Sequence, residues 1–151
     1  MKKSILIWAL LLTVTAGSTF ANNNDNGVSD KVIKSFKKEF NSAQDVQWEQ
    51  SRGFAKATFK LNDQIVCAYY SEEGDLLGLT RNIVSTQLPI SLLADLKKDY
   101  NGYWITDLFE MAAQDTTNYY ITIENSDYTI VLKSSGSEGW EVYRKEKKEN
   151  Y

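Results

Sequence analysis

The pattern of hydrophobic and polar residues along the chain occurs twice. In residues 32–41 (VIKSFKKEFN) hydrophobic residues recur at the spacing of one helix face, with a lysine pair beside them. Sixty positions later, residues 92–101 (LLADLKKDYN) repeat this pattern, including the lysine pair and the final asparagine. Because internal repetition reflects architecture, the sequence predicts one helix-led unit present in two copies.

After each helix the hydrophobic period changes to two. In residues 54–61, Ala57 and Phe59 alternate with Thr58 and Lys60, which predicts a strand with one buried and one wet face. Asn62 and the residues around it form a turn signal, and further short strands follow up to residue 83. In the second copy the pattern predicts four strands, at residues 105–111, 118–124, 128–133 and 140–145.

The two copies align best when the offset between them changes from 60 to 62 near residues 114–115. Phe59 then corresponds to Ile121, and the polar positions of the strands also correspond. The register of the strand at Ile105–Met111 stays open, because Trp48 corresponds to Leu108 at offset 60 and to Phe109 at offset 61. A slip of one residue would turn every side chain of that strand to the other face.

These patterns predict an α+β fold made of a tandem repeat, in which each copy is a helix followed by a four-stranded antiparallel meander. We place the copies at residues 28–85 and 86–146, within a single domain of residues 28–151 that ends in a charged C-terminal tail. One copy of about 60 residues buries too little surface for stability. We therefore expect one eight-stranded antiparallel sheet with two helices on one face.

The N-terminus carries the features of a secretory signal. Lys2 and Lys3 precede a hydrophobic run at residues 5–14, and small residues lead to Ala21. The run is shorter than the ~20 residues of a membrane span, so a cleaved signal is favoured over an anchor. We expect a signal peptide at residues 1–21, a flexible leader at residues 22–27, and a periplasmic or secreted protein with no stable membrane insertion after cleavage.

Composition excludes several classes of function. The chain has no histidine, which excludes Ser-His and Cys-His nucleophiles and histidine-ligated metals. Its net charge of −3 argues against nucleic-acid binding, which needs a basic face. Cys67 is the single cysteine, so it forms no internal disulfide, and a shielded structural thiol is favoured over a reactive one. Residues 72–75 (EEGD) lack the spacing of a calcium loop. We expect no catalytic, cofactor-binding or metal-binding residues.

A set of short motifs then suggests a family. The helix motif SFKKEF at residues 35–40 is followed by DVQW at residues 45–48, by AYY at residues 68–70, and by Leu88-Pro89 before the second helix. In order and spacing these motifs resemble the PepSY-like family of exported bacterial proteins, also described as beta-lactamase-inhibitor-like. The resemblance implies a tandem helix-plus-meander fold without catalytic residues. In the related inhibitor fold it implies an open sheet face that binds a target enzyme.

The sheet face turned away from the helices is the candidate functional surface. Tyrosine is favoured on surfaces that are solvent-exposed in the free protein and buried in a complex, although it is also common in strands that have no binding role. By alternation, the large side chains that we expect on this outward face are Ile65, Tyr69, Tyr120, Val131 and Tyr143.

We therefore interpret the sequence as that of an exported, non-enzymatic binding module. The outward sheet face would bind a protein or peptide, and the partner could be an exported hydrolase that is inhibited. The alternative is a small-ligand carrier or sensor in the periplasm, with a pocket between the helices and the sheet. The sequence names neither the partner nor the oligomeric state.

Overall fold

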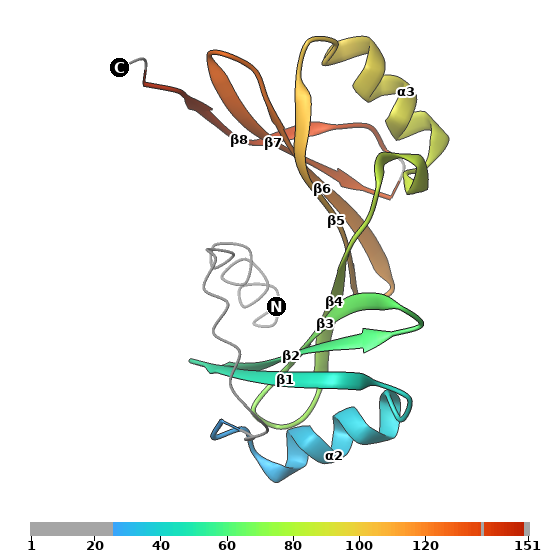
Figure 1. Cartoon of the computed structure of the whole chain (residues 1–151), viewed down its shortest axis with the longest axis vertical. Helices are drawn as coiled ribbons and strands as arrows, with labels where there is room; N and C mark the ends of the chain where they lie inside the picture. Colours follow the sequence, from blue (N-terminus) through green and yellow to red (C-terminus); the bar gives the residue numbers. More distant parts are fainter. Residues whose placement is uncertain (1–25, 137, 150–151) are drawn as a thin grey trace. The chain divides into compact units, whose positions relative to one another are not determined.

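A computed structural model confirms the predicted fold class. It describes residues 26–136 and 138–149, so the expected signal peptide lies outside the described residues. The strands form a single eight-stranded antiparallel sheet in the order β1-β2-β3-β4-β5-β6-β7-β8, accompanied by two helices (Figure 1). Each strand follows its neighbour in sequence, as the meander pattern predicts.

The first copy consists of α2 and strands β1 to β4, and the second of α3 and strands β5 to β8. The bounds in the first copy are α2 (Asp30–Glu39), β1 (Gln44–Ser51), β2 (Phe54–Leu61), β3 (Gln64–Tyr70) and β4 (Leu76–Asn82). A short 3-10 helix, η1 (Ser85–Gln87), connects the copies, and the second comprises α3 (Ile90–Asp99), β5 (Trp104–Ala113), β6 (Thr116–Glu124), β7 (Tyr128–Ser135) and β8 (Glu141–Lys147).

Contacts divide the chain into two compact units, and the division falls within β3 and β4. The described residues of unit 1 are 26–63 and 67–77, and those of unit 2 are 64–66 and 78–149 without residue 137. Unit 2 thus takes the start of β3 and most of β4 from the first copy. None of the described helices is long and hydrophobic enough to cross a membrane.

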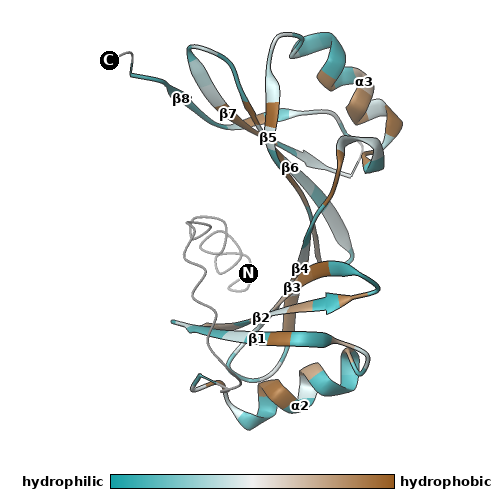
Figure 2. Ribbon diagram, in the orientation of Figure 1, coloured by the Kyte–Doolittle hydropathy of each residue, from teal (hydrophilic) through white to brown (hydrophobic). Residues whose placement is uncertain are grey.

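In unit 1, α2 packs on the sheet through aromatic rings. Phe36 is buried, and its ring lies 5.2 Å from that of Trp48, 5.0 Å from Phe59 and 6.4 Å from Tyr70, with edge-to-face geometry in each case. Ser29 caps the helix by accepting the backbone N–H of Val32 at 3.5 Å. In Figure 2 both hydrophobic and hydrophilic residues lie on α2 and α3, as expected for helices with one buried face.

In unit 2, α3 packs on an aliphatic core. Leu96 belongs to one buried cluster with Leu108, Ile121 and Leu132. This cluster resolves the open register of the first strand of the second copy, because Leu108 faces the core that includes α3 and Phe109 faces the opposite side. Offset 60 is therefore the correct alignment at this strand.

Candidate functional site

The sheet of unit 2 has one face that lies opposite the α3 core, and we call it the helix-free face. Successive residues of a strand point to opposite faces, so the neighbours of Leu108, Ile121 and Leu132 point away from α3. The strand register aligns one such residue from each of five strands into a row: Asn82, Phe109, Tyr120, Lys133 and Glu141.

Three aromatic rings form the centre of the helix-free face. The rings of Phe109 and Tyr120 are stacked, with centroids 5.1 Å apart and 13° between their planes. Tyr143 meets Tyr120 edge-on at 5.9 Å and 88°. Tyr120 is buried, at 5% exposure, while Phe109 and Tyr143 are half-buried on either side of it. We call Phe109, Tyr120 and Tyr143 the ring cluster.

The burial of Tyr120 affects its hydroxyl group. Burial, followed by the proximity of Tyr143 and Glu141, raises the pKa of Tyr120 to about 12. Its hydroxyl therefore stays protonated at neutral pH.

Two of the five residues predicted for the outward face, Tyr69 and Tyr120, are buried. Tyr69 is buried in unit 1 at 7% exposure, with its ring 6.1 Å from that of Phe54. An outward position in the alternation does not make Tyr69 or Tyr120 accessible, because large side chains of neighbouring strands cover them laterally on the same face. Of the other three, Ile65 is 59% exposed, and Val131 and Tyr143 are half-buried.

Cys67 is also less exposed than an outward-facing thiol would be. It is a free, half-buried cysteine, and its Sγ atom lies 3.6 Å from Oγ1 of Thr58. This contact agrees with the structural interpretation that the sequence favoured.

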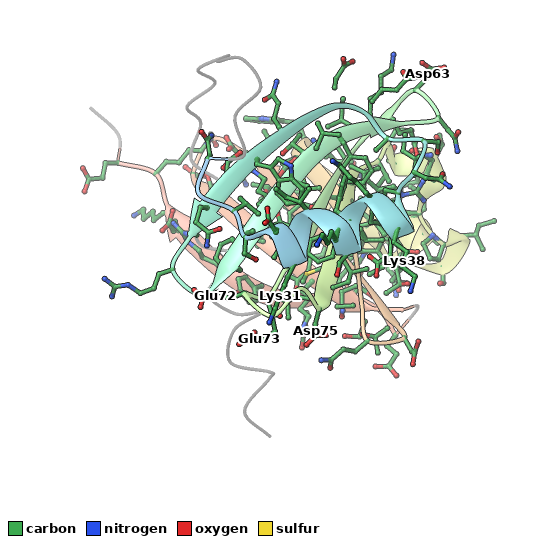
Figure 3. The ribbon with its side chains drawn as sticks, turned by 90° about the horizontal axis from the view of Figure 1, so that it is seen from below. Lys31, Lys38, Asp63, Glu72, Glu73 and Asp75 are labelled. Carbon is green, nitrogen blue, oxygen red and sulfur yellow. The ribbon has the colours of Figure 1, made fainter. Side chains whose placement is uncertain are left out.

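The acidic turn between β3 and β4 is a packing element. Gly74 adopts φ +89°, and a Cβ atom there would lie 3.1 Å from Oγ of Ser35 and 3.3 Å from the carbonyl oxygen of Lys31 in α2. Figure 3 shows Glu72, Glu73 and Asp75 in the same region as Lys31. Within the described residues, no group of three or more acidic or cysteine side chains is arranged to hold a metal ion.

A polar row on the α3 side of unit 2 was missed by the sequence analysis. Nε and Nη2 of Arg81 donate to the two carboxylate oxygens of Glu110 at 3.1 and 3.2 Å, and Nη1 donates to Oε1 of Gln64 at 3.0 Å. The strand register continues this row from Glu110 to Tyr119 and from Tyr119 to Ser134. No local motif marks these residues, because they come from five different strands and only the arrangement of the sheet brings them together.

Comparison with known proteins identifies the fold. No protein-family model matches the chain, and no curated protein sequence matches it. Among solved structures, a BLIP-like protein from Bacteroides fragilis has a TM-score of 0.67 and 16% identity, with 82% of this chain and 88% of that chain covered. A DUF2874 family protein from Bacteroides ovatus has a TM-score of 0.70 and 14% identity, with 83% and 89% covered.

A third similar structure comes from another Bacteroides species. It is a protein from Bacteroides eggerthii that is proposed to be periplasmic, with a TM-score of 0.70, 12% identity, and 80% of this chain and 88% of that chain covered. Identities this low establish similarity of fold. The chain thus shares its eight-stranded, two-helix fold with BLIP-like and DUF2874 proteins of Bacteroides species.

Proposed function

We propose that this protein is an exported, non-enzymatic binding module that holds a protein or peptide partner on the helix-free face of unit 2. The observation that carries the proposal is the ring cluster. Tyr120 is fixed by stacking on Phe109 and by the edge of Tyr143, while those two flanking rings remain half-buried. A pre-ordered aromatic centre loses little side-chain entropy on binding and is typical of energetically dominant contacts.

The surroundings of the ring cluster fit a protein partner. Val131 is half-buried on the same face. Thr122 on β6 pairs directly with Val131, and Thr129 lies two residues before Val131 on β7. Hydrophobic side chains at the centre and hydroxyl groups around them match the anatomy of protein interfaces. Similarity to a BLIP-like protein supports the same class, and an exported hydrolase is the partner that we would test first.

Two observations favour binding over catalysis. The whole chain lacks histidine, so this face offers no histidine general base, and the raised pKa of Tyr120 keeps its hydroxyl protonated. The expected signal peptide and the similarity to a protein proposed to be periplasmic support a location in the cell envelope.

The proposal is tested at Val131 rather than at the buried tyrosines. Val131→Glu places a charge beside the ring cluster without opening a cavity, so the fold should be retained. We expect recovery of a partner from periplasmic extract to fall more than about tenfold, since a central contact contributes about 1–2 kcal/mol. Retention of the fold is checked by circular dichroism and thermal unfolding.

Ile90→Ser is the matched control. Ile90 is 86% exposed on α3, away from the helix-free face, so this change replaces a hydrophobic side chain outside the proposed binding face. We expect Ile90→Ser to recover the partner as the unaltered protein does, and the recovered partner to lose activity if it is a hydrolase. If folded Val131→Glu protein recovered as much partner as the unaltered protein does, the proposed binding face would be contradicted.

A further inference from the structure

We propose that the outer edge of β1 binds an extended peptide segment of a partner protein, which adds to the sheet as a further antiparallel strand. β1 is the first strand in the sheet order, so β2 alone pairs with it among the described strands. The last residues of β1, Glu49, Gln50 and Ser51, are all exposed. An exposed edge leaves backbone N–H and C=O groups free to pair with another chain. The site is independent of the function proposed for the helix-free face of unit 2.

A hydrogen bond from Asn26 shows which backbone groups of β1 point outward. Nδ2 of Asn26 donates to the carbonyl oxygen of Trp48 at 3.0 Å, so this oxygen points away from β2. In an antiparallel pair, successive residues direct their backbone groups alternately towards one neighbouring strand and the other. The N–H and C=O of Gln50 therefore also point outward, and no described residue bonds to them.

The second copy shows what such an edge can hold. At the offset of 60 established by the two cores, Trp48 corresponds to Leu108 and Gln50 to Glu110. Both strands also have a register shift near their start, so they correspond in local geometry as well as in position. In the second copy this edge is covered, because β4 pairs with it and places Arg81 opposite Glu110.

Asn26 takes the place of the end of β4. In unit 2, the N–H of Ile83 donates to the carbonyl oxygen of Leu108 at 3.1 Å, and β4 pairs with the residues of β5 that follow. In unit 1, the side chain of Asn26 makes the equivalent bond, and no described strand continues beside β1. The first copy thus has the edge but lacks the strand that covers it in the second. The pairing of β4 with β5 gives the direction and register that we expect for an added strand.

The two outer strands of the sheet differ in how they are protected. Proteins commonly protect a free edge with lysine or proline, and β8, the last strand of the sheet, carries Lys145 and Lys147. From Trp48 to Ser51, β1 contains neither lysine nor proline. The β1 edge is therefore the one that can accept another chain.

The charge on β1 restricts the chemistry of the added segment. Glu49 is the charged residue between Trp48 and Ser51, and it is exposed. An acidic side chain directly opposite Glu49 would be repelled. Proline at a paired position would remove the N–H that the edge needs. We therefore expect a neutral or basic extended segment without proline.

The probe is a capped peptide with the sequence of residues 78–84 (GLTRNIV), because this segment occupies the equivalent edge in unit 2. It is titrated into isotope-labelled protein while the backbone amide signals are followed by NMR. We expect shifts concentrated in residues 48–51 and a Kd of about 1 mM or tighter. A peptide with glutamate in place of Asn82 should bind about threefold more weakly, since this glutamate would face Glu49.

Methylation of the peptide backbone distinguishes strand addition from other kinds of binding. A methyl group on the nitrogen of Arg81 in the peptide removes the N–H that would bond to the C=O of Gln50. This change should weaken binding at least about tenfold. A methyl group on the nitrogen of Asn82 is the matched control, because that N–H would point away from β1. It should change the Kd by less than about twofold.

Variants of the protein make the same test from the other side. Gln50→Pro removes the outward N–H of β1, and proline is tolerated on an edge strand where the N–H faces solvent, so the fold should be retained. We expect the peptide to cause no shifts in β1 of this variant. Gln50→Thr is the matched control, since it loses the same side chain but keeps the N–H. Gln50→Thr and Val131→Glu should both bind the peptide as the unaltered protein does.

Three results would overturn the inference. The first is no shift of any β1 amide at a peptide concentration of about 10 mM. The second is equal affinity of the peptides methylated at Arg81 and at Asn82. The third is a dimer of the protein that Gln50→Pro abolishes, because a second copy of the chain would then occupy the edge.

Discussion

At the scale of single residues, Tyr70 shows how one polar atom is accommodated in the core of unit 1. Tyr70 is fully buried, and its hydroxyl donates to Oε2 of Glu39 at 2.6 Å. The bond joins β3 to the last turn of α2. Burial, followed by the hydrogen bond to Glu39, raises the pKa of Tyr70 well above its ordinary value of 10.0.

We expect Tyr70→Phe to lower the free energy of unfolding by about 1.5 kcal/mol, because a hydrogen bond to a charged acceptor is lost while the ring is kept. Urea denaturation at neutral pH measures this change. Tyr103→Phe is the control, since the Tyr103 hydroxyl makes no hydrogen bond to any described residue. A loss of the same size in both variants would show that the Glu39 contact contributes nothing specific.

The same residue predicts a dependence of stability on pH. Because the folded state raises the pKa of Tyr70, it favours the protonated hydroxyl. The stabilisation is therefore fully present below about pH 10 and is lost as pH rises above that value. Denaturation curves between neutral pH and about pH 11 should show this decline. The decline should be smaller in Tyr70→Phe, and an identical pH profile in both proteins would contradict the assignment.

Burial on the helix-free face could not be predicted residue by residue. Alternation places Tyr120 and Val131 on this face correctly, since both lie opposite the α3 core. It does not say that Phe109 stacks on Tyr120 and buries it. The exposure of a strand residue depends on the size of its cross-strand neighbours, and those neighbours follow from register rather than from local sequence.

At the scale of elements, β8 shows how a charged segment becomes part of the sheet. The sequence indicated a strand at residues 140–145 followed by a charged tail, and the structure continues β8 to Lys147. Lys148 then donates its backbone N–H to the carbonyl oxygen of Asp127 at 2.8 Å. Its Nζ atom lies 2.6 Å from Oε2 of Glu124 and 5.2 Å from the ring centroid of Trp104. These contacts anchor the end of an edge strand.

We expect Lys148→Met to destabilise the protein by no more than about 1 kcal/mol, because both members of the ion pair are partly exposed and the cation–π contact is weak at such a site. In Lys148→Met, amide hydrogen exchange should become faster than in the unaltered protein, and this increase should be larger in β8 than in β6. Lys147→Met is the control, since Lys147 makes no ion pair with any of the residues that the structure describes. Equal exchange rates in β8 of the two variants would contradict an anchoring role for Lys148.

At the scale of the whole molecule, the repeats of the sequence differ from the compact units of the structure. Unit 2 includes residues 64–66 and most of β4 from the first copy. Ile83 is buried in the α3 core, and its N–H donates to the carbonyl oxygen of Leu108 at 3.1 Å. β4 also pairs with β5 from Leu79 to Asn82. The second copy is therefore incomplete without the end of the first.

We expect the isolated second copy, residues 86–149, to be unfolded in solution. It lacks Ile83 and leaves Glu110 without Arg81, so it loses both core and cross-strand contacts. A fragment of residues 78–149 restores both and should recover native-like circular dichroism and dispersed amide NMR signals. A folded 86–149 fragment would show that the copies are independent of β4.

The sequence alone determined the elements and their order. Two helical stripes, the period-two strands and the turn residues specify two helix-plus-meander copies, because these signals act between residues close in the chain. The tertiary structure decided which side chains meet. The ring cluster and the polar row depend on the pairing of β4 through β8. Bulges in β5 and β8 shift the register of this pairing locally. Pairing between strands sets these contacts, so no single segment of the chain contains them.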